Sequence, residues 1–176
     1  MKEYRLNTAE LRGFCAQLNA GDKVLLSGTV YTARDAAHKR MFELIESQKD
    51  LPFEIENSVI YFAGPTPTPD NLPIGSCGPT TSSRMDGYTP MLHDMGLVAT
   101  IGKGDRNAAV IESIKRNNAV YLCAIGGAGA LAAMQITECD VIAFEDLGCE
   151  SVKKLTFDNF PLIVGIDSKG GNIFKR

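Results

Sequence analysis

The sequence predicts an α/β layered domain whose sheet is substantially parallel. Short apolar stretches that are typical of strands alternate with stretches that carry apolar residues at helical spacing. The strand stretches are apolar throughout rather than alternating, which is typical of parallel strands buried on both faces. With 176 residues, 44% of them hydrophobic and 22% charged, the chain has the length and composition of one globular domain spanning residues 1–176.

The first part of the chain contains two expected helices with a β-rich stretch between them. Residues 7–10 resemble a capping box, and apolar residues follow at helical spacing as far as a stop at Gly21. Residues 23–31 are rich in β-formers but are interrupted by Gly28, which predicts either a strand pair or one strand with a bulge. This stretch is also the candidate for a second β layer. Residues 36–48 predict the second helix.

A buried strand and a long loop occupy the middle of the chain. Residues 59–63 (VIYFA) predict the strand, and residues 64–79 contain five of the eight prolines and three glycines. Loops of this length are uncommon inside compact domains and are often functional. Thr80 or Thr81 can then cap a third helix that continues to a stop at Gly96.

The last part of the chain alternates between the two kinds of element. Strands are expected at residues 97–101, 119–125, 141–144 and 162–166. Helices are expected at residues 108–116, 129–136 and 151–155. No repeat of fixed period and no low-complexity tract interrupts this order, which supports a sheet flanked by helices.

Charge and hydropathy exclude several classes of partner. The formal net charge is −3 with the signs interspersed, so no basic stripe indicates nucleic acid and no charged tail indicates a membrane surface. The N-terminus lacks the apolar run of a secretory signal. The longest stretch without a charged or strongly polar residue, residues 119–134, is shorter than the roughly 20 residues that a spanning helix needs, and three glycines interrupt it. We therefore expect a cytoplasmic protein with a small-molecule ligand.

The five cysteines have spacings that match none of the usual zinc or iron–sulfur motifs, so no metal site is expected on this chain. Disulfides are not expected in a cytosolic setting. Cys15, Cys123 and Cys139 have apolar neighbours and are interpreted as small buried hydrophobic residues. Cys77 differs because it lies in the loop of residues 64–79.

The most informative local pattern is residues 75–86 (GSCGPTTSSRMD), where a proline-stiffened loop rich in hydroxyl groups leads into an expected helix. The free N–H groups and the positive dipole end of a helix N-terminus favour a carboxylate. Arg84, about one turn into that helix, can add a planar bidentate partner. The alternative is an ordinary capped helix with a surface arginine, and the local pattern alone favours it slightly.

Two further cations follow other expected strands. Ligands collect at strand ends in open α/β sheets, so Arg34 suits a ligand contact, although a surface pair with Asp35 is the alternative. His38 is expected to face solvent and to be structural rather than catalytic. Lys103 lies between two glycines but lacks the following Ser or Thr of a phosphate loop. We interpret Lys103 as a third cation for a polyanionic ligand.

A competing motif is found late in the chain. Residues 127–132 (GAGALA) follow a strand, open a helix and precede Glu145 and Asp146, which is the outline of a dinucleotide fold. The helix is short and alanine replaces the third glycine, so nicotinamide binding is the weaker reading. We interpret the glycines of residues 126–129 as close packing between helix and strand, or as backbone contacts with a ligand or partner.

Several separated motifs together resemble one known family. They are GDKVLLSGTVYTARDAAHKR, YFAGPTP, GSCGPTTSSRMDGYTP, GKG, AIGGAGAL and FEDLG. In this order, between about residues 21 and 167, they are similar to the β subunit of class I iron–sulfur fumarate hydratases and L-tartrate dehydratases. Several motifs in one order are more specific than any single motif, so the resemblance outweighs the local alternatives.

The resemblance implies a swivelling β/β/α domain, with a largely parallel sheet flanked by helices and a second β layer, that closes over a partner. It implies that an α subunit holds a four-iron four-sulfur (4Fe-4S) cluster on three cysteines, that this chain alone binds no cofactor, and that the assembly is α2β2. By the same resemblance Arg34, Arg84 and Lys103 match ligands of the substrate carboxylates. Thr80 matches the proposed catalytic base, and Cys77 has no role in the cluster.

We therefore expect the β subunit of a hydro-lyase that is active only with the α subunit. The expected reaction is that of fumarate hydratase, the reversible conversion of malate to fumarate and water. L-tartrate dehydratase, which forms oxaloacetate from tartrate, is the alternative within the family. A non-catalytic dicarboxylate-binding or interaction module is an alternative of another class. Thr80 would need an activating neighbour, because an unassisted threonine hydroxyl is protonated at neutral pH.

Overall fold

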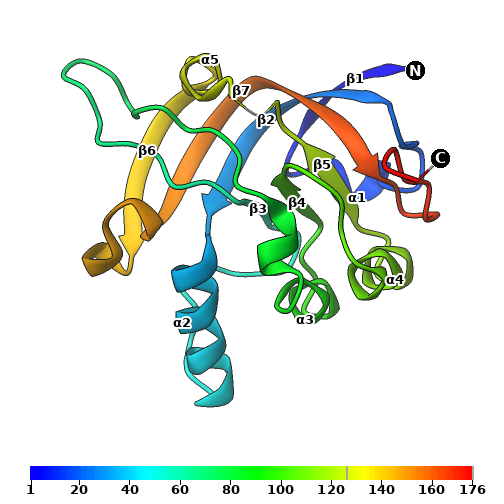
Figure 1. The fold of residues 1–176 in the computed structure, drawn as a ribbon, viewed down its shortest axis with the longest axis horizontal. Coiled ribbons are helices and arrows are strands. Elements are labelled where there is room, and N and C mark those ends of the chain that lie inside the picture. Colours follow the sequence, from blue (N-terminus) through cyan, green and yellow to red (C-terminus); the bar gives the residue numbers. More distant parts are fainter. Residues whose placement is uncertain (126, 176) are drawn as a thin grey trace.

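The computed structural model describes residues 1–125 and 127–175, and within them seven strands form one mixed sheet in the order β1-β2-β3-β4-β5-β7-β6 (Figure 1). The strands are β1 (Glu3–Asn7), β2 (Lys23–Thr32), β3 (Val59–Tyr61), β4 (Ala99–Gly102), β5 (Val120–Cys123), β6 (Ile136–Ala143) and β7 (Val152–Ile166). The helices are α1 (Leu11–Phe14), α2 (Asp35–Glu46), η1 (Ser82–Met85), α3 (Thr89–Asp94), α4 (Ala108–Arg116), α5 (Gly129–Ala133) and η2 (Glu145–Glu150), where η denotes a 3-10 helix.

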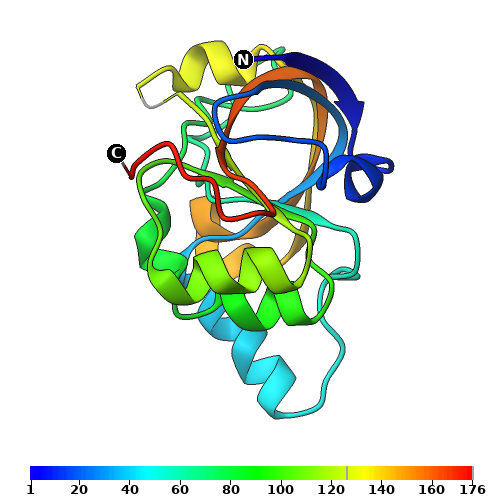
Figure 2. The same cartoon turned by 90° about the vertical axis from the view of Figure 1, so that its right-hand side faces the viewer.

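The sheet closes on itself through its longest strand. Strands β1 to β5 pair in parallel, one after another along the chain, which confirms the substantially parallel sheet. Strand β7 runs antiparallel to β5 and β6 and also pairs with β2 from Lys23↔Ile163 to Thr32↔Lys153. Strands β2, β3, β4, β5 and β7 therefore form a closed ring, which is seen end-on in Figure 2.

The glycine in β2 is the site of a bulge, as the sequence indicated. The register of β2 against β7 shifts between Leu26 and Gly28, and Gly28 has a φ of +105° that favours glycine. Residues 23–32 are nevertheless one continuous strand, so the alternative of a strand pair is wrong. The bulge bends β2 enough for it to pair with β1 near its start and with β3 near its end.

Hydrophobic residues form three clusters: one inside the ring, one between the ring and helices α2 and α3, and one beneath α4. Successive side chains of a strand point to opposite faces, so Tyr61 belongs to the inner cluster and Phe62 to the cluster beside α2 and α3. In the inner cluster the rings of Phe157 and Phe160 stack at 4.1 Å. Helices α2, α3 and α4 lie together on one side of the ring, whereas α5 lies at the other end of the molecule (Figures 1 and 2).

Two expected helices are wrong in physically understandable ways. Of the expected helix at residues 151–155, residues 152–155 belong to β7, where Lys153, Leu155 and Phe157 are buried at the two-residue period of a strand. The third helix, expected to run from Thr80 or Thr81 to Gly96, is two short helices, η1 and α3. Thr81 makes no capping hydrogen bond to η1.

Other expected elements are present but begin or end at different residues. The expected strand at residues 141–144 starts earlier as β6, so α5 is shorter than expected. The capping box is present in part, because the Asn7 N–H donates to Glu10 Oε1 at 2.9 Å, but α1 is only four residues long. Among the described residues, no helix has the length and apolar character needed to cross a membrane.

Candidate functional site

The parallel strands β2, β3 and β4 end beside one another, and the segments that follow them form the candidate site. The Ala33 N–H donates to the Tyr61 carbonyl at 3.2 Å, and the Phe62 N–H donates to the Ile101 carbonyl at 2.8 Å. These bonds continue the strand pairing one residue past the strand ends. Because the carboxyl ends of parallel strands meet at one edge, side chains that lie far apart in the sequence become neighbours there.

Thr80 and Lys103 lie together at this edge. The Thr80 N–H donates to the Phe62 carbonyl at 2.6 Å, and the Lys103 N–H donates to the Thr80 carbonyl at 3.3 Å. The Ser82 N–H then donates to the Lys103 carbonyl at 2.9 Å, so residues 80–82 run alongside the end of β4. Thr80 is half-buried and the Lys103 side chain is exposed, which leaves the ammonium group accessible to an anion.

Arg34 precedes α2 and is held in a narrow space. Its Nη2 atom lies 3.6 Å from Glu150 Oε1, and its side chain is 20% exposed. On another side the guanidinium lies over Gly64, where an added Cβ would be 2.8 Å from Nη1 and 3.1 Å from Cδ of Arg34. Within the described residues the buried Nε of Arg34 has no hydrogen-bond partner. Arg34 therefore keeps donor capacity for a ligand.

Arg84 forms an ion pair with Asp35, the residue that follows Arg34 at the start of α2. Its Nε donates to Asp35 Oδ1 at 3.0 Å, and the Arg84 side chain is 51% exposed. The sequence alternative of a surface pair between Arg34 and Asp35 is thereby replaced by one between Arg84 and Asp35. Since Asp35 follows Arg34 directly, the structure brings the two arginine-bearing segments together at the start of α2.

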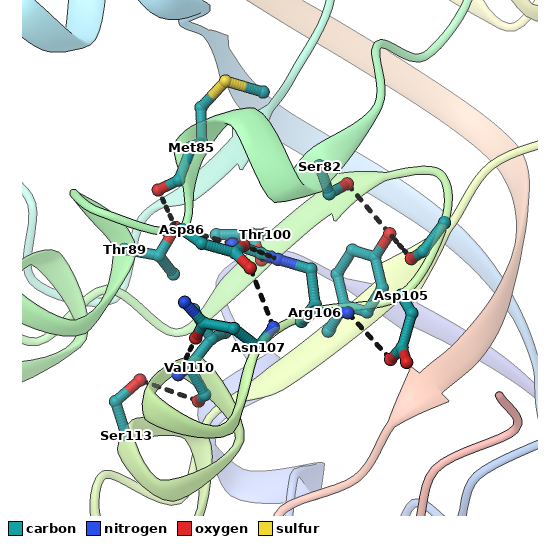
Figure 3. A network of polar contacts seen from close by, with 12 residues as sticks. Ser82, Met85, Asp86, Thr89, Thr100, Asp105, Arg106, Asn107, Val110 and Ser113 are labelled. Atoms are coloured by element: carbon teal, nitrogen blue, oxygen red, sulfur yellow. Dashed lines mark hydrogen bonds and ion pairs between the residues drawn. The ribbon is translucent and has the colours of Figure 1, made fainter. Parts of the chain in front are cut away.

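A buried ion pair that the sequence did not reveal supports η1 and the segment after β4 (Figure 3). Arg106 Nε donates to Asp86 Oδ1 at 2.6 Å, and the Arg106 side chain is fully buried. The same guanidinium donates to Thr89 Oγ1 at 2.7 Å and to Thr100 Oγ1 at 3.1 Å. Asp86 also accepts from the Asn107 N–H at 2.8 Å. With its partners saturated, Arg106 serves the architecture rather than a ligand.

Contacts of Arg106 with two aromatic rings, and of a tyrosine hydroxyl with the backbone, further stabilise this region. The Arg106 guanidinium lies 5.3 Å from the ring centre of Phe62 and 5.0 Å from that of Tyr121. The Tyr121 hydroxyl donates to the Gly104 carbonyl at 2.8 Å and lies 2.8 Å from Ser82 Oγ. These contacts join the segment of Lys103 to the helix of Arg84.

His38 is buried, which corrects the expectation that it faces solvent. Its Nδ1 lies 2.8 Å from the Arg34 carbonyl, and its ring packs 5.4 Å from Tyr88 and 5.6 Å from Phe62. Burial lowers the pKa of His38 to about 4, so the imidazole is neutral at pH 7. His38 thus packs behind the start of α2, which agrees with the structural reading.

The thiol groups offer no metal site among the residues that the structure describes. Burial raises the pKa of Cys15 to about 11 and that of Cys77 to about 12, which makes both thiols inert. Cys123 and Cys139 are partly rather than fully buried, and Cys149 is exposed. No three His, Cys, Asp or Glu side chains are gathered so as to hold a metal ion in residues 1–125 and 127–175.

The glycine-rich segment near α5 packs against the candidate site. The Cys77 N–H donates to the Gly129 carbonyl at 3.0 Å, and a Cβ on Gly129 would come within 3.0 Å of the Gly78 nitrogen. Gly129 therefore permits a close backbone approach, although to the loop before Thr80 rather than to a strand. Gly126, which belongs to the same motif, lies outside the described residues.

Comparisons with known proteins agree with one another. The sequence model of a family described as "Fumarase C-terminus" matches residues 1–176. The chain is 36% identical over 169 residues to "Fumarate hydratase class I, anaerobic" of Escherichia coli (strain K12), covering 95% of this chain and 31% of that protein. It is also 36% identical over 169 residues to "Fumarate hydratase 2" of Leishmania major, covering 95% of this chain and 30% of that protein.

A second kind of relative has nearly the same length as the matched region. The "Putative L(+)-tartrate dehydratase subunit beta" of Methanocaldococcus jannaschii is 39% identical over 166 residues, covering 91% of this chain and 85% of that protein. The "L(+)-tartrate dehydratase subunit beta" of Escherichia coli (strain K12) is 32% identical over 161 residues, covering 89% and 79%. By contrast, the chain spans about a third of the length of the fumarate hydratases that it matches.

Proposed function

The chain belongs to the fumarase C-terminus family, and on this premise we propose that it binds the dicarboxylate substrate and supplies the base of an iron–sulfur hydro-lyase. The reaction is the reversible dehydration of malate to fumarate and water, and it requires a partner polypeptide. The observation that carries the proposal is the meeting of Thr80, Lys103 and the two arginine-bearing segments at one edge of the sheet.

The two carboxylates of the substrate would be bound by Arg34, Arg84 and Lys103. Arg34 and Arg84 each keep guanidinium N–H groups that can form planar, bidentate contacts with a carboxylate. Lys103 adds a mobile point charge on the exposed side. Removing a proton next to a carboxylate places additional negative charge on that carboxylate, so the same cations would stabilise the transition state more than the ground state.

Thr80 would take the proton from the substrate carbon. Its backbone is fixed between the ends of β3 and β4 by hydrogen bonds to the backbones of Phe62 and Lys103. A free threonine hydroxyl is a weak base, so the partner polypeptide would have to provide an activating group. Lys103 would also favour the deprotonated form of a neighbouring hydroxyl.

The partner would provide the 4Fe-4S cluster, as the family resemblance implies. When bound, such a cluster supplies a Lewis acid for the departing hydroxyl group. The names of two relatives include "subunit beta", which supports a division between two chains. In this arrangement the domain swivels over the partner and brings its edge of cations onto the substrate, within an α2β2 assembly.

L-tartrate dehydration is the second candidate. It is favoured by the two tartrate dehydratase relatives, of which the matched region covers 85% and 79%. Tartrate has one hydroxyl more than malate, so the same carboxylate contacts would serve either substrate. Discrimination would then depend on groups that contact the additional hydroxyl.

The test is to produce the chain together with a candidate cluster-bearing partner, reconstitute the cluster without oxygen, and assay malate, fumarate and both tartrate isomers. We expect turnover by the complex and none by either polypeptide alone. A complex that binds a dicarboxylate but turns over none of these compounds would instead support a non-catalytic binding module. Absence of dicarboxylate binding as well would refute both readings.

A further inference from the structure

We infer that Glu150 is a positioning residue that fixes the guanidinium of Arg34 in the orientation needed for a carboxylate, an inference that rests on the proposed function. Glu150 is the last residue of η2, the turn that begins with the FEDLG motif at residue 144. Nothing in the proposed chemistry uses this motif. Its contacts, however, lead directly to the start of α2.

One end of the turn is joined to α2 by an ion pair between Asp146 and Arg40. Asp146 accepts two hydrogen bonds from Arg40, at 2.7 Å and 2.9 Å, and the Arg40 guanidinium lies 5.0 Å from the ring centre of Phe144. Phe144 has a φ of +56° and Gly148 a φ of +59°, so the backbone turns sharply at both ends of the motif. A side chain forced into the left-handed region indicates that the surroundings determine this turn.

The other end of the turn accepts hydrogen bonds from the buried side chain of Lys153. Lys153 Nζ donates to Ser151 Oγ at 2.6 Å and to the carbonyls of Gly148 and Cys149 at 3.2 Å each. Burial lowers the pKa of Lys153, but its donors are directed at oxygen atoms of the turn rather than at solvent. Lys153 thereby fixes the backbone on both sides of Glu150.

Glu150 extends from this turn to two groups at the start of α2. Its Oε2 accepts from the Ala36 N–H at 2.9 Å, and its Oε1 lies 3.6 Å from Arg34 Nη2. The N-terminus of α2 has no capping side chain of its own, since Arg34 occupies the cap position and makes no cap hydrogen bond. Glu150 thus supplies the missing cap and a counter-charge for the guanidinium with one carboxylate.

The turn also limits how far Arg34 can move in the opposite direction. An added Cβ on Gly64 would lie 2.8 Å from Arg34 Nη1 and 3.2 Å from the Cys149 carbonyl. Arg34 therefore lies in a slot between Glu150 and the backbone of Gly64. A carboxylate-binding arginine acts only if its planar donors are aimed correctly, so the position of Glu150 determines the quality of that site.

The decisive variant is Glu150→Gln, because the amide oxygen can still accept from Ala36 while the charge beside Arg34 is removed. The matched control is Glu145→Gln, an exposed residue of the same 3-10 helix. In the isolated chain, the side-chain Nε–H signal of Arg34 is followed by ¹⁵N NMR and assigned by its loss in Arg34→Lys. We expect Glu150→Gln, but not the control, to shift and broaden this signal.

In the assembled enzyme, Glu150→Gln should lower kcat/KM roughly tenfold, mainly through KM, because Arg34 is no longer held in one orientation. Glu150→Asp should recover part of the loss. An unchanged Arg34 signal, or a kcat/KM that rises because Glu150 only competes with the substrate for Arg34, would overturn the inference. A wild-type complex without turnover would instead refute the proposed function, even where the NMR result holds, so the two failures are distinguishable.

Discussion

Asp35 accepts a hydrogen bond from Arg84 at 3.0 Å although the two residues are 49 positions apart in the sequence. The bond connects the first turn of α2 to η1, and thus the segment of Arg34 to the segment of Arg84. It uses Nε of Arg84, which leaves the two terminal nitrogen atoms of the guanidinium for another acceptor. The relative position of the two proposed carboxylate ligands therefore depends on one carboxylate of the protein.

Replacing Arg84 by lysine tests whether its planar group matters. We expect Arg84→Lys to lower kcat/KM roughly a hundredfold in the assembled enzyme, because a lysine keeps the charge but loses bidentate geometry. Steady-state kinetics with malate, together with the iron content of the complex, would measure this. Wild-type kinetics would show that Arg84 does not bind the substrate.

Replacing Thr80 tests the proposed base. Thr80→Ala should lower kcat by roughly a hundredfold or more while KM and iron content change little, because a missing base affects the chemical step. Thr80→Ser should keep more activity than Thr80→Ala. If the alanine variant turns over malate at a normal rate, another group must abstract the proton.

Gly64→Ala tests the slot that holds Arg34. The new Cβ would lie 2.8 Å from Arg34 Nη1, so the guanidinium must shift and KM for malate should rise roughly tenfold. Gly13→Ala is the matched control, because an added Cβ there would meet nothing within 4 Å. Equal KM values for both variants would mean that Arg34 tolerates displacement.

Arg106→Met tests the buried network beneath the site. The substitution leaves the Asp86 carboxylate buried without its cation, which should lower the free energy of unfolding by about 3 kcal/mol. The control is Arg116→Met, which removes an exposed pair with Asp94 and should change the free energy of unfolding far less. Urea unfolding of both variants measures the difference, and equal values would contradict the structural role of Arg106.

The buried histidines predict a loss of stability in mild acid. Burial lowers the pKa of His38 to about 4 and that of His93 to about 3, so both are neutral in the folded chain. In the unfolded chain they bind protons below about pH 6.5, and stability that is present above that pH is lost as the pH falls towards 4. For each histidine this amounts to about 2 kcal/mol between pH 7 and pH 5.

Urea unfolding at these two pH values provides the measurement. The variant His38→Phe should reduce the pH dependence by about half, since one of the two titrating groups is removed. A curve that is flat from pH 7 to pH 5 would contradict the assignment of neutral, buried imidazoles. A general loss of stability at both pH values in the variant would not by itself alter the slope.

The parts of the fold that were predictable from the sequence are those that depend on nearby residues. Helix α4 covers residues 108–116 as expected, because its apolar spacing is regular and the Asn107 side chain accepts from the Val110 N–H at its start. Among the candidate site residues, Arg34 and Lys103 were predicted from their positions after strands and Arg84 from its place near a helix start, whereas the role of Thr80 came from the family resemblance. Their catalytic roles remain a proposal.

The parts that were missed depend on partners far away in the sequence. Residues 151–155 were expected to form a helix in the alternating series of elements, yet most of them pair in β7, and Lys153 is buried by its contacts with the η2 turn. Arg106 had no sequence signal, since Asp86 is 20 residues away. Glu150 likewise has a role only because the chain returns to Ala36 after 114 residues.

The closure of the ring by β7 also constrains how the chain can reach its native state. Lys23 pairs with Ile163, and Thr32 pairs with Lys153, so the pairing that completes the ring joins opposite ends of the sequence. Contacts between such distant residues form slowly, because a long loop must be closed before they stabilise anything. During synthesis the ring cannot close until β7 has left the ribosome, and until then one edge of β2 remains open to pairing with other chains.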